Sequence, residues 1–412
     1  MQNKKQKLLQ QELAKPSMSK GLIFLFTLSG AAAIGNLYWA QPLLGMISRS
    51  FGIPIAQSGS LITFTQLGYA LGILLLMPLG DALNRRYFIP LLMALSAVFL
   101  LVSAIAPVYW SMLAGLALVG VTSLGGQLLL PLAGDLTRHD ERGRVIGIIA
   151  SGMLIGTMLS RLMGGIIADW FGWRSTYLAA ALVDACLAVI LLMRLPNDKP
   201  RPRIAYGKLL FSIVGIVRNS RPVQTTIVLG ACTFAVYTMF WTGLTFLLSA
   251  PPFSFTPTQI GLLNLVGLAG SFAAKNAGKF HDKGRSTPVT GLGLATVFLA
   301  LIVAPAGSQS VAVIIVSTLL FNFAMQIVFV LSQTRLLSMK AELRSRLNTA
   351  YVVFCFIAGA AGSMVAGSLW QSGGWTLLIS GEVAVIILAL LFWFFQRSTL
   401  KSIEVTNSDS FQ

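Results

Sequence analysis

A single arginine interrupts a long apolar, glycine-rich stretch of the chain, SGMLIGTMLSRLMGG at Ser151–Gly165. If this stretch crosses a bilayer, an arginine near the bilayer centre costs roughly 2.5–3.5 kcal/mol of insertion free energy. Arg161 is therefore expected to face either a group of opposite charge or a water-filled cavity.

Two carboxylic acids, Asp184 and Glu382, lie well inside other apolar stretches. Acids in such surroundings are typical of proton relays, so both are predicted proton carriers. Asp184 is the acid nearest to Arg161 in expected depth, with a mismatch of about 6 Å at 1.5 Å per helical residue. One interpretation is a buried Arg161–Asp184 ion pair that fastens two helices. The other is that Arg161 lines a cavity, where it binds a substrate group or tunes a proton-carrying acid.

Further polar and aromatic side chains recur on single faces of the apolar stretches. Asn322 and Gln326 are four residues apart, as are Tyr237 and Trp241, so each pair shares one face of a helix. The predicted substrate-cavity residues are Asn36, Tyr38, Gln41, Gln66, Arg161, Tyr237, Trp241, Asn322 and Gln326. The alternatives are hydrogen bonds between helices for the amides and an interfacial belt for the aromatic rings.

The elements that must position these residues are membrane-spanning helices. Of the 412 residues, 55% are hydrophobic and only 10% are charged, whereas soluble domains have about 25% charged residues. Twelve stretches reach the roughly 20 apolar residues that a spanning helix needs. They are 21–45, 57–79, 88–106, 108–136, 143–168, 173–194, 222–249, 257–279, 286–305, 310–338, 346–369 and 374–396. The sequence therefore predicts an all-α polytopic membrane protein.

The positive charges indicate the orientation of these spans. Of the 30 lysines and arginines, all but Arg49, Arg161 and Arg174 fall in the termini, in the loops after every second span, or at their edges. By the positive-inside rule both termini are expected in the cytoplasm. The predicted divisions are an N-terminal tail at 1–20, six-helix halves at 21–194 and 222–396, a cytoplasmic loop at 195–221, and a C-terminal tail at 397–412.

The chain repeats itself at an offset of 202 residues. Gly165, Gly172 and Trp173 recur as Gly367, Gly374 and Trp375. Gln57, Gly59 and Trp39 likewise recur as Gln259, Gly261 and Trp241. Together these matches indicate duplication of a six-span unit, which suits a transporter that rocks about a site near the bilayer midplane.

A short charged turn, LMPLGDALNRRYF at Leu76–Phe88, resembles the cytoplasmic signature of the major facilitator superfamily, and GKFHDKGR is its second copy. The first copy keeps the aspartate and both arginines but has Met77, Ala82 and Asn84 at other signature positions.

The resemblance implies twelve helices in two pseudo-symmetric halves. It also implies a conformational latch between the halves, and we expect Asp135 to pair with Arg85. The predicted latch residues are Asp81, Arg85, Arg86, Asp135, Asp282 and Arg285; the alternative is a topology signal with a stabilising ion cluster.

The fifth span resembles a glycine motif of proton-coupled drug exporters through Gly147, Gly156 and Gly164. Ser160 and Arg161 replace the Gly-Pro pair of that motif. Small residues of this kind allow close packing on a neighbouring helix.

These observations predict a secondary transporter, most simply a proton-coupled exporter of a small amphipathic molecule in the inner (plasma) membrane. Uptake by proton symport and facilitated exchange are the alternatives, and a membrane-embedded enzyme is a distant one. No phosphate-binding loop is present, and the cysteines and histidines have no companions at metal-site spacing. We expect no cofactor, no metal and no nucleic acid, and partners limited to substrate, protons and the lipid bilayer, with the protein a monomer.

Overall fold

The computed structural model of the chain describes residues 18–138, 140–197, 215–267, 280, 284–339 and 343–408, without the side chains of Asp81 and residues 402–408. Every regular element in these ranges is a helix. The first set is α2 (Lys20–Gly35), η1 (Gln41–Leu43), α3 (Leu44–Phe51), α4 (Ile55–Ser58), α5 (Ser60–Leu76), α6 (Leu79–Ala82), α7 (Arg85–Ala104), α8 (Tyr109–Thr122), α9 (Gly125–Leu136), α10 (Arg142–Phe171) and α11 (Trp173–Arg194). The second set is α13 (Arg221–Ser249), α14 (Pro257–Leu263), η2 (Asn264–Gly267), α16 (Ser286–Val303), η3 (Ala304–Gln309), α17 (Val311–Leu337) and α18 (Arg344–Ser408).

Nine helical segments in the described ranges are long and apolar enough to cross a bilayer. The last of them, Arg344–Lys401, contains two of the expected spans, because Gly373 and Gly374 leave helical geometry and kink α18 between them. The expected span at 257–279 begins with α14 and η2, and its remainder lies outside the described residues. The chain is thus a multi-pass helical membrane protein, as the sequence predicts.

The prediction of one continuous helix over 21–45 is wrong. α2 ends at Gly35, residues 36–40 form turns, and η1 and α3 follow. Pro42 disfavours a continuous helix here, because proline has no N–H and its ring clashes with the carbonyl group four residues earlier. The break puts Asn36, Tyr38 and Gln41 at the junction of two helical segments.

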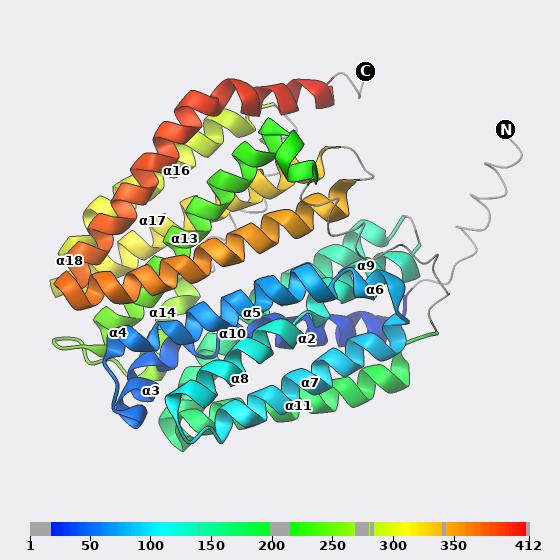
Figure 1. Cartoon of the computed structure of the whole chain (residues 1–412), viewed down its shortest axis with the longest axis horizontal. Helices are drawn as coiled ribbons and strands as arrows, with labels where there is room; N and C mark the ends of the chain where they lie inside the picture. The colour runs from blue at the N-terminus through cyan, green and yellow to red at the C-terminus, as the bar shows by residue number, and fades with distance from the viewer. Residues whose placement is uncertain are drawn as a thin grey trace, which may run out of the picture.

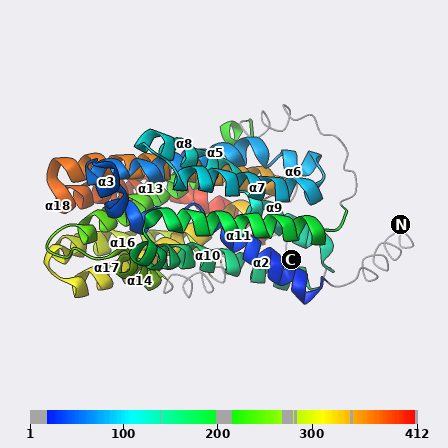
Figure 2. The ribbon, with the colours of Figure 1, turned by 90° about the horizontal axis from the view of Figure 1, so that it is seen from below.

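The helices form two bundles, α2–α11 and α13–α18, which lie side by side (Figure 1). We call one end of the molecule the basic end; its helix termini are Lys20, Arg194, Arg221 and Arg344. The distal end, opposite, carries α3, α4 and the start of α14. In Figure 1 the second bundle slopes away from the first toward the basic end. Figure 2 shows the face of the first bundle where α11 packs along α7.

The internal repeat is visible at two turns of the distal end. Gly172 and Gly374 have φ values of 83° and 62°, a region that side chains other than glycine rarely adopt. Each glycine is followed by a buried tryptophan, Trp173 or Trp375. The same turn therefore reverses the chain at corresponding points of both halves.

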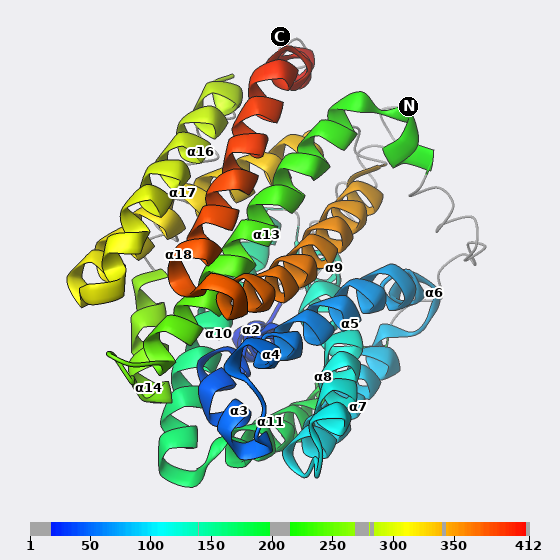
Figure 3. The same ribbon diagram turned by 60° about the vertical axis from the view of Figure 1, so that its left-hand side comes forward.

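Glycines bring the two bundles into backbone contact near the distal end. A Cβ atom on Gly165 of α10 would overlap the carbonyl oxygen of Pro257, at the start of α14. In the repeat-related position, a Cβ on Gly367 of α18 would lie 2.5 Å from the carbonyl oxygen of Ala56 in α4. Figure 3 shows α18 lying against α4 and α5 here. We call these two repeat-related contacts the glycine seam.

Hydrogen bonds between the bundles reinforce the glycine seam. The backbone N–H of Thr258 donates to Asp169 Oδ2 at 2.9 Å, which joins α14 to α10. On the other side Ser363 Oγ donates to the carbonyl oxygen of Gly59 at 2.8 Å. The distal end is therefore closed by direct backbone packing of the two bundles.

Gly165→Ala should destabilise the glycine seam, because its methyl group would overlap the backbone of Pro257. Overpacking of this kind costs typically about 1–3 kcal/mol. We expect a lower melting temperature of the purified protein, measured by intrinsic fluorescence. Gly147→Ala, on the same helix but with open space around the new Cβ atom, is the matched control. Equal melting temperatures for the two variants would contradict the packing described here.

Candidate functional site

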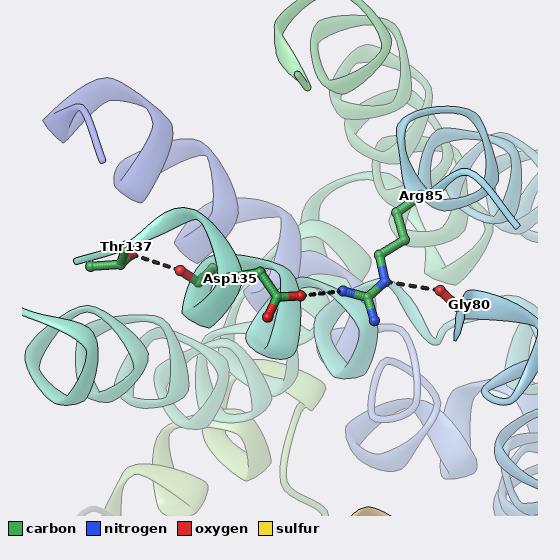
Figure 4. Close-up of polar contacts among 5 residues, drawn as sticks. Gly80, Arg85, Asp135 and Thr137 are labelled. Atoms are coloured by element: carbon green, nitrogen blue, oxygen red, sulfur yellow. Dashed lines mark hydrogen bonds and ion pairs between the residues drawn. The ribbon is translucent and has the colours of Figure 1, made fainter. Parts of the chain in front are cut away.

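At the basic end, Arg85 is buried and connects three helices of the first bundle. Its Nη1 lies 3.0 Å from Asp135 Oδ2, and its Nε donates to the carbonyl oxygen of Gly80 at 2.9 Å (Figure 4). The hydroxyl group of Thr137 bonds the carbonyl oxygen of Ala133 at 2.6 Å and closes the end of α9. The Arg85–Asp135 ion pair expected from the sequence is therefore present, and it ties α6 and α7 to α9.

The other predicted latch residues lie apart from this ion pair or outside the described residues. Arg86 Nη1 donates to Asn197 Oδ1 at 2.7 Å, after the end of α11. Arg285 is exposed at the N-cap of α16. The side chain of Asp81 and the whole of Asp282 lie outside the described residues.

Arg335 is a buried cation that the sequence interpretation overlooked. It lies near the end of α17, and its Nη2 donates to Ser286 Oγ and Thr290 Oγ1, both at 3.2 Å. It thereby joins α17 to α16 in the second bundle, as Arg85 joins helices in the first. Ser286 and Thr290, four residues apart on one helix face, were the only sequence signal for this contact.

Arg161 lies at the boundary between the two bundles and is only 2% exposed. Its Nε donates to Gln41 Oε1 at 2.6 Å, so the η1 segment holds the guanidinium group. The guanidinium carbon lies 4.4 Å from the ring centre of Tyr38, in the broken part of the first span. It also lies 5.4 Å from the ring centre of Trp241, in α13 of the second bundle.

Of the two interpretations of Arg161, the ion pair with Asp184 is absent from this structure, because Asp184 bonds Asn36 instead. Asn36 Nδ2 donates to Asp184 Oδ2 at 2.7 Å and approaches Ser96 Oγ at 3.2 Å. Trp39 Nε1 in turn donates to Asn36 Oδ1 at 3.0 Å. The break after α2 thus brings one amide to the acid and another, that of Gln41, to Arg161. Depth along a helix could not reveal these intervening amides.

Glu382 is fully buried within the second bundle, in the part of α18 after the kink. Among the described residues, neither of its carboxylate oxygens has a hydrogen-bond partner. Glu382 therefore differs from Asp184, whose carboxylate is held by an amide.

The remaining predicted cavity residues are Gln66, Tyr237, Asn322 and Gln326, and their surroundings differ. Gln66 Nε2 reaches Thr238 Oγ1 at 3.4 Å across the two bundles, which fits the alternative of hydrogen bonds between helices. Tyr237 is half-buried and lies parallel to Phe321, with ring centres 6.4 Å apart. Asn322 instead bonds the carbonyl oxygen of Thr318 in its own helix, and Gln326 is half-buried in α17.

Two of the three span-5 glycines are packing positions. A Cβ atom on Gly156 would lie 2.5 Å from the carbonyl oxygen of Ala31, and one on Gly164 would lie 3.1 Å from the Trp39 ring. α10 therefore packs closely against the first span at positions before and after Arg161 in the sequence. Gly147 has open space around it, so the predicted close packing is wrong at that position.

The described part of the chain thus presents a buried cation that contacts aromatic rings of both bundles, and a separate buried acid, Asp184, that bonds Asn36. No group of three metal-ligating His, Cys, Asp or Glu side chains occurs in these residues. A positive charge, an amide and aromatic ring surfaces therefore meet where the two bundles adjoin.

The comparisons with known proteins agree with this architecture. The profile described as Major Facilitator Superfamily matches residues 24–363. The uncharacterized transporter YgaY of Escherichia coli O157:H7 is 36% identical over 383 residues, 92% of this chain and 97% of its own. The probable transporter SCO4007 of Streptomyces coelicolor is 32% identical over 363 residues, 87% of this chain and 84% of its own.

Among solved structures, a bacterial homologue of the human lysosomal transporter Spinster, inward-facing and occupied, has the same fold. It superposes with a TM-score of 0.76 at 16% identity and covers 92% of this chain and 96% of its own. The family match spans both bundles, and two full-length relatives exceed 30% identity. The chain therefore belongs to the Major Facilitator Superfamily of secondary transporters.

Proposed function

We propose that this transporter exports a small amphipathic molecule against proton entry, as in the drug:proton antiporter branch of the superfamily. It would act as a monomer in the inner (plasma) membrane, with its basic end in the cytoplasm. The positive-inside rule supports this orientation, since helix termini rich in lysine and arginine gather at that end.

The observation behind the proposal is the position of Arg161. A buried cation that contacts Tyr38 of one bundle and Trp241 of the other responds to any rocking between the bundles. Substrate at this point can be exposed first to one side of the membrane and then to the other, which is alternating access. The glycine seam at the distal end supports a conformation open toward the basic end.

Proton coupling is proposed for Asp184, with Glu382 as the second candidate. Asp184 is 1% exposed and hydrogen-bonded to Asn36, five residues before the Gln41 that holds Arg161. Movement of this short segment would change the surroundings of Arg161 and Asp184 together. Substrate and proton could therefore be linked through one broken helix.

The latch is proposed to act at the basic end when the bundles close there. The Arg85–Asp135 pair and the bond from Arg85 to Gly80 fix the turn that contains Asp81. An aspartate held in this way can engage the start of α18, where the helix N-terminus and Arg344 and Arg346 are positive.

Proton-coupled uptake or exchange is the alternative, because Ser160 and Arg161 replace the Gly-Pro pair of the exporter motif. Everted vesicles with an acidic lumen separate these functions. An antiporter accumulates its substrate in such a lumen, a proton symporter releases it, and a facilitated exchanger does not respond to the gradient.

Asp184→Asn should abolish uphill transport and leave downhill exchange intact, because asparagine has no exchangeable acidic proton but can still bond Asn36. The measurement is accumulation of amphipathic fluorescent compounds in proteoliposomes with an imposed pH gradient. Glu382→Gln is the parallel variant. Loss of uphill transport in Glu382→Gln alone would assign coupling to Glu382 instead. Uphill transport in both variants would exclude these acids as the carriers.

Asp81→Ala should reduce transport several-fold without lowering the amount of protein in the membrane, because the latch is lost while the bundles remain folded. Transport rate and membrane abundance are measured on the same vesicles. Asp140→Ala is the control: Asp140 pairs with Arg138 at 3.0 Å on the surface of the same end, where such pairs contribute about 0–1 kcal/mol. If Asp81→Ala transports like Asp140→Ala, the latch proposal fails.

A further inference from the structure

The positive charge of Arg161 has no carboxylate partner within the described residues. Asp184 and Glu382, the acids well inside the expected spans, do not pair with it. Asp184 Oδ2 accepts from Asn36, while Asp184 Oδ1 and both oxygens of Glu382 have no hydrogen-bond partner among the described residues. A buried cation that lacks an opposite charge is costly, so an anion that enters this site is favoured.

A hydrogen-bond donor without an acceptor, the indole N–H of Trp241, lies near this cation. Trp241 is 2% exposed, and its indole N–H has no hydrogen-bond partner in the described part of the chain. The indole ring is also the one that Arg161 approaches from the other bundle. A buried N–H without an acceptor costs free energy, and a ligand that brings an acceptor removes that cost.

The surroundings of this site are aromatic rather than polar. Tyr237 packs edge-on to Trp241, with ring centres 6.4 Å apart, and parallel to Phe321 at the same separation. Tyr38 covers Arg161 from the first bundle. Ring surfaces of this kind suit a flat apolar group better than a heavily hydrated ion.

From these contacts we propose that the transported molecule is an aromatic organic monoanion, such as an aryl carboxylate. Its carboxylate would accept hydrogen bonds from the guanidinium group of Arg161 and from the indole N–H of Trp241. Its ring would lie among Tyr38, Tyr237 and Phe321. A single cation favours one negative charge over the two of a phosphate monoester. The inference rests on the proposed transport function and specifies its substrate class.

The test is calorimetric titration of the purified full-length protein in nanodiscs at neutral pH, without any gradient. The probes are benzoate, 3-phenylpropanoate and 2-naphthylacetate, each compared with its neutral amide. We expect at least one carboxylate to bind about tenfold or more tightly than its amide, since hydrogen bonds to charged groups are worth roughly that factor. Equal affinity for every acid and amide, or no binding of any carboxylate, overturns the proposal.

Two variants assign the binding to the proposed groups. Arg161→Gln should weaken carboxylate binding about tenfold or more and leave amide binding little changed. Trp241→Phe keeps a ring but removes the N–H, and it should weaken carboxylate binding several-fold. Arg174→Gln is the matched control, because Arg174 also lies over a tryptophan ring, that of Trp173 at 4.3 Å, but is exposed.

Wild-type affinity for carboxylates in Arg161→Gln would overturn the proposal. If that variant does not fold, the proposal is still tested by two other results. These are the ratio of carboxylate to amide affinity in the wild type and the carboxylate affinity of Trp241→Phe. The binding measurement needs no proton gradient and is made at one fixed pH. A protein that prefers carboxylates but fails in the gradient assay refutes only the proposed antiport, whereas one that couples to protons without this preference refutes only the substrate class.

Discussion

The contact of the Arg161 guanidinium group with both bundles is the interaction on which the rest of this structure depends. Gln41 fixes the group from the first bundle, and the rings of Tyr38 and Trp241 lie on either side of the boundary. Burial of a cation at this depth is tolerated only where polar and aromatic neighbours stabilise it. The surrounding helices are arranged accordingly, with small residues of α10 against the first span and a helix break that brings Gln41 to the cation.

The same break connects Arg161 to the buried acid of the first bundle. Asn36 and Gln41 are only five residues apart, and they hold Asp184 and Arg161 respectively. A shift of this segment therefore changes two charged environments at once. The glycine seam restricts such shifts at the distal end, and the Arg85–Asp135 pair stiffens the basic end of the first bundle.

Much of the fold could be predicted from the sequence, because lipid requires long apolar helices and the repeat fixes their grouping. The Arg85–Asp135 pair was also predictable, since a short turn leaves few partners. The sequence left two interpretations of Arg161 open and did not reveal its contact with Gln41, because helix depth says nothing of rotation or of a break at residues 36–40. Arg335 was missed because an arginine near a helix end is ordinarily explained by the positive-inside rule. Its hydrogen bonds to Ser286 and Thr290 depend on how α16 and α17 pack, which the sequence does not show.

An experimental structure with a bound aryl carboxylate would test this account most directly. The account predicts the ligand carboxylate within about 3 Å of the Arg161 guanidinium nitrogens, between Tyr38 and Trp241, with Asp184 still bonded to Asn36. A ligand bound away from Arg161, or an ion pair between Arg161 and Asp184 in the occupied site, would contradict it.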